Sequence, residues 1–231
     1  MPELKLLIDI EQDTDNAKYF IANWEFLEWF IPRDFQYILS DAFTPESRNI
    51  VIAEYTKHIY KIRENKIANW LNLTIGTWEG IKLKYYELTD RIFKWHKWLS
   101  WDYRWYISVY NMYPRNIDEK YFYFPYEYSF WNPVWVIGHE MLHFIFFDYL
   151  SKIYWIEEKT KFEWKPSNFV WQVSETFNNV IEDWKPYTDL IDEKESKSTY
   201  PGCEKLYEDM TKIWNENYDI DILLKSVFDI K

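Results

Sequence analysis

The chain is poor in cysteine, glycine and proline, and each shortage excludes a class of protein. Among its 231 residues are one cysteine, four glycines and nine prolines. A lone cysteine, Cys203, rules out a disulfide framework and fits a reducing compartment, so a cytoplasmic location is expected. Low glycine and proline contents exclude collagen-like and Pro/Gly-rich disordered chains. One globular domain spanning residues 1–231, with a core of its own, is therefore expected.

Positive charge and long apolar runs are also scarce. The chain has 27 Lys and Arg against 38 Asp and Glu, a net charge of −11. An acidic surface disfavours phosphate contacts, so nucleic acid is not an expected partner. The longest apolar run, 132–150, is interrupted by polar residues, and the N-terminus lacks a basic start followed by an apolar core. Neither a membrane span nor a signal peptide is expected, and the oligomeric state is left open.

Tryptophan, by contrast, is abundant, with 15 residues against the four glycines. Packing of aromatic side chains in the core is the favoured explanation, and aromatic binding surfaces are an alternative. A third is that the source organism reads a stop codon as glycine, which the universal code would print as tryptophan. Trp184 is the candidate under this hypothesis, because it lies where a helix is expected to end and glycine is favoured.

The residue pattern predicts a helix-rich α+β fold. Alternation of apolar residues predicts strands over 5–10, 104–112 and 120–124, with a turn at 114–116. Periodicity and capping residues predict helices over 17–31, 44–65, 132–150 and 166–183, a loop over 188–201, and one or two helices within 203–229. The small antiparallel or mixed sheet thus precedes a buried central helix.

That central helix carries His139, Glu140 and His143. Residues four apart in a helix share one face, so the two imidazoles can bind one ion, while Glu140 can reach a water on that ion. Apolar residues surround the three, and burying them without partners would cost several kcal/mol, on the order of a few per group. The sequence therefore predicts one Zn²⁺ per chain with Glu140 as general base. The alternative is two core histidines bonded to backbone or acids.

A catalytic zinc needs a third protein ligand, and the helix over 166–183 is its expected source. Its polar stripe includes Trp171 and Glu175, and the helix has no Lys or Arg, which is unusual for a solvent-exposed face. We expect Glu175 to be the ligand and Asn179 to orient a ligand histidine. His58 and His96 are expected at the surface or an interface. The alternatives to Glu175 are Glu182, then Glu157, Glu158 and Glu163.

The segments HEMLH (139–143) and SETFNN (174–179) resemble the gluzincin zinc metallopeptidases, whose pattern is HExxH followed by a glutamate on a later helix. The resemblance covers about 104–185 and implies His139, His143 and Glu175 as zinc ligands, and a peptide or protein as substrate. It also implies that the strand 104–112 or 120–124, at a sheet edge, binds substrate backbone. Tyr187 is the favoured transition-state stabiliser. Asn179 stands where the family often has aspartate.

Three functions follow from these residues as hypotheses. The first is a zinc-dependent hydrolase, most specifically a metallopeptidase. The second is a regulatory HExxH domain that acts on one intracellular partner, which would cleave no general peptide. The third is a non-enzymatic metal-binding module, in which a fourth protein ligand would close the zinc site.

Overall fold

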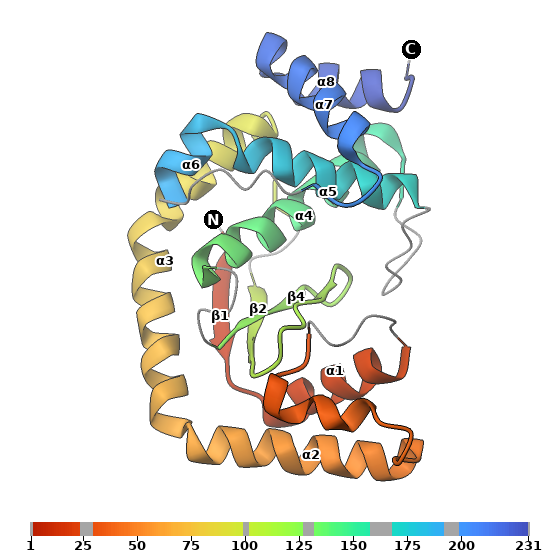
Figure 1. Ribbon diagram of the computed structural model, residues 1–231. Helices are drawn as coiled ribbons and strands as arrows, with labels where there is room; N and C mark the ends of the chain where they lie inside the picture. The colour runs from red at the N-terminus through yellow and green to blue at the C-terminus, as the bar shows by residue number, and fades with distance from the viewer. Residues whose placement is uncertain are drawn as a thin grey trace. The chain divides into compact units, whose positions relative to one another are not determined.

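The computed structural model describes residues 2–23, 30–98, 102–126, 132–157, 168–191 and 199–230. They form a helix-rich α+β fold with a four-stranded mixed sheet, which confirms the predicted class (Figure 1). The chain groups into two units, each described by itself below. The sheet unit comprises Pro2–Trp78 and Asp102–Val136, and the helical unit comprises Glu79–Trp101 and Ile137–Lys231. A single domain over 1–231 stays a prediction.

The sheet unit has strand order β1-β2-β4-β3, in which β1, β2 and β4 are parallel and β3 is antiparallel to β4. The predicted strands are present, and the predicted turn at 114–116 contains the short strand β3. The unit's elements are β1 (Glu3–Leu7), α1 (Ile10–Asn23), η2 (Arg33–Leu39), α2 (Pro45–Ile62), the first half of α3 (Glu64–Ile92), β2 (Asp102–Ser108), β3 (Arg115–Asn116), β4 (Tyr121–Pro125) and the start of α4 (Pro133–Tyr154).

The pairing of these strands corrects part of one expectation, that a strand at a sheet edge binds substrate backbone. The strand predicted over 104–112 is β2, which pairs with β1 on one side and with β4 on the other. The strand predicted over 120–124 is β4, which pairs with β2 and, over Tyr121–Phe122, with β3. Ladder hydrogen bonds occupy both sides of β2 over Arg104–Tyr106, so this part offers no free edge for substrate backbone. The strand β4 is paired on both sides only at Tyr121–Phe122, so a role of its remaining part in binding substrate backbone stays a prediction.

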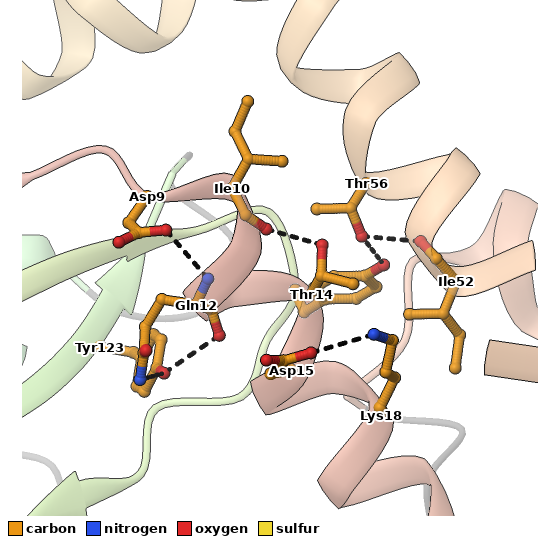
Figure 2. A network of polar contacts seen from close by, with 10 residues as sticks. Asp9, Ile10, Gln12, Thr14, Asp15, Lys18, Ile52, Thr56 and Tyr123 are labelled. Atoms are coloured by element: carbon orange, nitrogen blue, oxygen red, sulfur yellow. Dashed lines mark hydrogen bonds and ion pairs between the residues drawn. The ribbon is translucent and has the colours of Figure 1, made fainter. Parts of the chain in front are cut away.

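Polar contacts attach α1 and α2 to the sheet (Figure 2). Asp9 Oδ1 accepts from the backbone N–H of Gln12 at 3.0 Å, and the Gln12 amide donates to the Tyr123 hydroxyl of β4 at 2.9 Å. Thr56 Oγ1 of α2 lies 2.7 Å from the Tyr110 hydroxyl just after β2. One apolar core cluster of the unit comprises Ala17, Phe20, Ile21, Ile31, Phe35, Ile38, Ile52, Tyr110 and Met112.

The helical unit contains the second half of α3 and most of α4. Its other helices are α5 (Phe169–Glu182), α6 (Lys185–Ile191), α7 (Glu204–Asn217) and α8 (Ile220–Val227). The predicted start at Pro166 lies outside the described residues, and Asn168 caps α5 by accepting from Val170 and Trp171. The predicted loop over 188–201 is wrong at its beginning, because α6 runs to Ile191. Pro186 is tolerated in α6 since a first-turn N–H needs no helical partner.

The interior of the helical unit is built around α4. Phe146 of α4 and Phe177 of α5 have ring centroids 4.9 Å apart, and Phe177 also contacts Phe93 at 5.7 Å. Every residue of α4 from Val136 to Leu150 is buried, as its apolar sequence predicts. None of the helices in the described part of the chain has both the length and the hydropathy needed to cross a membrane.

Candidate metal centre

Three predicted ligands meet in the helical unit. His139 and His143 lie one turn apart on α4, and their Nε2 atoms are 3.1 Å apart. Glu175 Oε2 of α5 lies 3.4 Å from each of these two nitrogens. All three residues are buried, and His143 has no exposed surface. The structure therefore places two imidazole nitrogens and one carboxylate oxygen at the corners of a nearly equilateral triangle.

Three residues on one face of α5 contact the two-histidine motif. Glu175 supplies the oxygen, Asn178 Nδ2 donates to the His139 backbone carbonyl at 2.9 Å, and Glu182 Oε1 lies 2.8 Å from His139 Nδ1. Sequence reasoning assigned the orienting role to Asn179, which is only half-buried. Asn178 and Glu182 hold His139 instead, because successive side chains turn by about 100° around a helix and Asn179 lies on the other side of Glu175.

Glu182 fixes the orientation and tautomer of His139. A carboxylate only accepts hydrogen bonds, so His139 Nδ1 must carry the proton in the 2.8 Å contact with Glu182. When this imidazole is neutral, its other ring nitrogen, Nε2, carries the lone pair, and this atom lies 3.1 Å from His143 Nε2 and 3.4 Å from Glu175 Oε2. The sequence suggested Glu182 only as an alternative metal ligand. In the structure its carboxylate contacts His139 Nδ1, the ring nitrogen that does not belong to the triangle.

Negative charge surrounds His139. Burial lowers the pKa of this imidazole, but three neighbouring carboxylates outweigh burial and raise the pKa well above the ordinary value of 6.5. They belong to Glu182, Glu175 and Glu140. Carboxylates that stabilise a proton at this position also favour a bound cation.

The triangle fits a zinc ion. Zinc accepts two imidazoles and one carboxylate as ligands, each about 2.1 Å from the metal, so two ligands of a tetrahedral zinc lie roughly 3.4 Å apart. The observed separations of 3.1, 3.4 and 3.4 Å agree with that value. In the described part of the chain, this is the group whose three ligand atoms lie within 4.8 Å of one another.

The other candidate residues have different surroundings. Glu140 is 6 % exposed and lies close enough to His139 to raise its pKa. His58 is exposed on α2, as expected, but His96 is largely buried, and its Nε2 lies 2.7 Å from Asp148 Oδ2. The alternative ligands are separated from the triangle or not described: Glu157 is exposed, and Glu158 and Glu163 lie outside the described residues.

Tyr187 lies behind the motif rather than in a described contact with the ligands. Its ring is 1 % exposed on α6, and its hydroxyl lies against Gly138, the residue before His139. A Cβ on Gly138 would collide with that hydroxyl and come within 3.0 Å of Ile191 Cδ1. The Gly138 carbonyl accepts from the Tyr85 hydroxyl at 2.7 Å. Packing therefore requires glycine at 138, and a role for Tyr187 in catalysis stays a prediction.

We expect Gly138→Ala to destabilise the helical unit by about 1–3 kcal/mol, the usual cost of overpacking a core. The measurement is the free energy of unfolding in urea. Gly80→Ala is the matched control, because a Cβ there meets nothing within 4 Å and alanine favours the helix, so that variant should gain about 0.5–1 kcal/mol. Equal stabilities for the two variants would contradict the packing assigned to Gly138.

Comparison of the chain with known protein families, with curated proteins and with solved structures finds no match. Function therefore has to be argued from the site itself.

Proposed function

We propose that the chain is a zinc-dependent hydrolase and that its substrate is a peptide bond. One observation carries the proposal: two histidine nitrogens and a glutamate oxygen lie 3.1–3.4 Å from one another, next to Glu140. Two histidines and a glutamate are a ligand set of catalytic zinc, whereas structural zinc sites have four protein ligands. The choice of a peptide as substrate rests on the resemblance of HEMLH and SETFNN to the gluzincins.

Each residue has a separate task in this proposal. His139, His143 and Glu175 would hold the ion, which when bound supplies Lewis acidity and lowers the pKa of water. Glu140 takes a proton from the attacking water and returns it to the leaving amine. Glu182 keeps His139 Nδ1 protonated, and Asn178 fixes the backbone of α4 at the same residue.

Metal content tests the ligand assignment directly. The purified protein should contain about one zinc per chain by elemental analysis, and His143→Ala and Glu175→Gln should each lose it, because two ligands are too few to retain the ion. His58→Ala and Glu157→Gln are matched controls, since both residues are exposed, and they should keep the metal. Retention of zinc in His143→Ala would refute the assigned site.

Hydrolysis tests the reaction separately. A mixed peptide library should be cleaved by the zinc-loaded protein, cleavage should stop with a chelator, and added Zn²⁺ should restore it. Zinc binding without cleavage of any library peptide would contradict a general peptidase and would favour either the regulatory HExxH domain or the non-enzymatic metal-binding module. Cleavage that chelators leave unchanged would refute a metal-dependent reaction.

A further inference from the structure

A second candidate binding site lies within the sheet unit, beyond the carboxyl ends of β2 and β4. A hollow of about 210 Å³ opens there between α2 and the residues that follow the two strands. Its lining includes Asp34, Tyr55, Arg63, Ser108, Asn111 and Tyr126. Ligands of open sheets with parallel strands bind in this location, because side chains from consecutive loops converge where the strands end.

Two lining residues of this hollow, Ser108 and Val109, are hydrogen-bonded to a buried carboxylate. Asp13 has no exposed surface, and its two oxygens accept from Ser108 Oγ at 2.6 Å and from the Val109 N–H at 3.0 Å. The Tyr126 N–H donates to the Ser108 carbonyl at 3.0 Å, which ties the end of β4 to the end of β2. Because these hydrogen bonds already hold the lining residues in place, binding a ligand should cost little additional conformational entropy.

The wall of the hollow carries one positive and one negative side chain. Arg63 Cζ lies 5.6 Å from the centre of the Tyr126 ring, and the Tyr55 hydroxyl donates to Asp34 Oδ1 at 3.3 Å. Burial and then Asp34 raise the pKa of Tyr55, whereas Arg63 lowers it. Arg63 and Asp34 both belong to the lining of this hollow, so the hollow carries opposite charges.

We propose that this hollow binds a free amino acid with an apolar side chain. The carboxylate would bind the Arg63 guanidinium, whose planar donors match a carboxylate, and the ammonium would bind Asp34. A simple anion would be repelled by Asp34 and a simple cation by Arg63, so a zwitterion fits the wall best. Ile59, Val109 and Pro125 supply the apolar part of the lining, and the small volume limits the ligand to a single residue.

Three probes of similar shape test the charge pattern by NMR titration of the full chain. L-Leucine carries both charges, 4-methylpentanoate lacks the ammonium, and 3-methylbutylamine lacks the carboxylate. We expect leucine to shift the backbone amides of Val109, Asn111 and Tyr126 in a saturable way, and to bind at least about tenfold more tightly than either analogue, since each charged hydrogen bond is worth about that factor. No saturable shift with leucine, or equal affinity for 4-methylpentanoate, would overturn the proposal.

Two variants separate the roles of the charges. Arg63→Gln should lower leucine affinity about tenfold and leave the weak binding of 3-methylbutylamine unchanged or stronger. Asp34→Asn should also lower leucine affinity about tenfold, and it should leave the weak binding of 4-methylpentanoate unchanged or stronger. Lys61→Gln is the matched control, because it removes an exposed positive charge from the last turn of α2, two residues before Arg63 and outside the lining. An equal loss in Lys61→Gln would mean unspecific charge attraction and refute the site. Chelators should leave leucine binding intact, which keeps this test independent of the proposed metal centre.

Discussion

Replacement of Glu140 by glutamine is expected to leave zinc bound and to lower the rate of peptide hydrolysis about a hundred- to ten-thousandfold. Glutamine has the shape of glutamate, so the packing of a side chain that is only 6 % exposed should survive. It cannot accept a proton, however, and the reaction loses its general base. The ligand triangle of His139, His143 and Glu175 is not altered, so the zinc content should stay at about one per chain. The measurement is kcat on a library peptide together with elemental analysis.

Glu182→Gln is the matched control for this experiment. Its side-chain oxygen can still accept from His139 Nδ1, but the negative charge is gone. Loss of such a supporting carboxylate typically weakens metal affinity about 10–100-fold, whereas the variant saturated with zinc should retain most of the expected kcat. Glu140→Gln should thus lower kcat without loss of zinc, whereas Glu182→Gln should lower the affinity for zinc with little change in kcat. Full activity of Glu140→Gln would refute the proposed mechanism.

The clustering of the three candidate ligands could be predicted from the sequence because it depends largely on local geometry. A spacing of four residues brings His139 and His143 to one face of any α-helix, whatever the rest of the fold does. Glu175 was predictable because the α5 sequence lacks Lys and Arg on its polar stripe, which indicated burial. The orienting residues were not predictable in the same way. The choice between Asn178 and Asn179 depends on the rotation of α5 about its own axis, which is set by packing rather than by sequence spacing.

Sheet topology shows the same limit. Alternating residues predicted β1, β2 and β4 to within a few positions, because a strand's burial pattern is local. Strand order and direction depend on contacts distant in sequence, such as the parallel pairing of β1 with β2. An edge position was therefore expected for 104–112, whereas Arg104–Tyr106 is paired on both sides. The polar contacts from Asp13 to the end of β2, which shape the proposed amino-acid site, also join residues far apart in sequence.

Two tryptophans have a backbone conformation that favours glycine. Trp95, after α3, has a φ of 62°, and Trp155, after α4, has a φ of 58°. The backbone N–H of Trp95 donates to the carbonyl of Asp90, and that of Trp155 donates to the carbonyl of Ser151. Hydrogen bonds of this kind end a helix at a residue with left-handed backbone conformation. The side chains are 68 % and 88 % exposed, so little packing offsets the backbone strain. A bulky residue in this region is a genuine outlier, whereas glycine adopts it without cost.

Other tryptophans fit their positions well. Trp78, Trp105 and Trp214 are at most 1 % exposed. Trp184, the position at which the sequence suggested glycine, is absent from the described residues of positive φ, and its ring lies 5.5 Å from Trp214 and 5.8 Å from Tyr218. The structure therefore gives no support for glycine at 184. Among the described tryptophans, the structure separates the buried Trp78, Trp105 and Trp214 from Trp95 and Trp155, which are exposed at helix ends with positive φ.

We expect the double variant Trp95→Gly/Trp155→Gly to be more stable than the printed sequence by about 1–3 kcal/mol. Relief of left-handed strain contributes about 1–2 kcal/mol at each position, and the greater freedom of glycine in the unfolded chain offsets part of that gain. The free energy of unfolding in urea is the measurement. Trp105→Gly is the control, because removing a fully buried ring from β2 should cost at least about 3–5 kcal/mol.

The same reasoning predicts how the natural protein is encoded. If a stop codon is read as glycine in the source organism, the codons for positions 95 and 155 should be that codon, and those for Trp78, Trp105 and Trp214 should be the universal tryptophan codon. Peptide mass spectrometry of the protein from its natural source should then find glycine at 95 and 155. Universal tryptophan codons at both positions would reject the hypothesis, and the gain in stability would then reflect only the strain of two exposed tryptophans at helix ends.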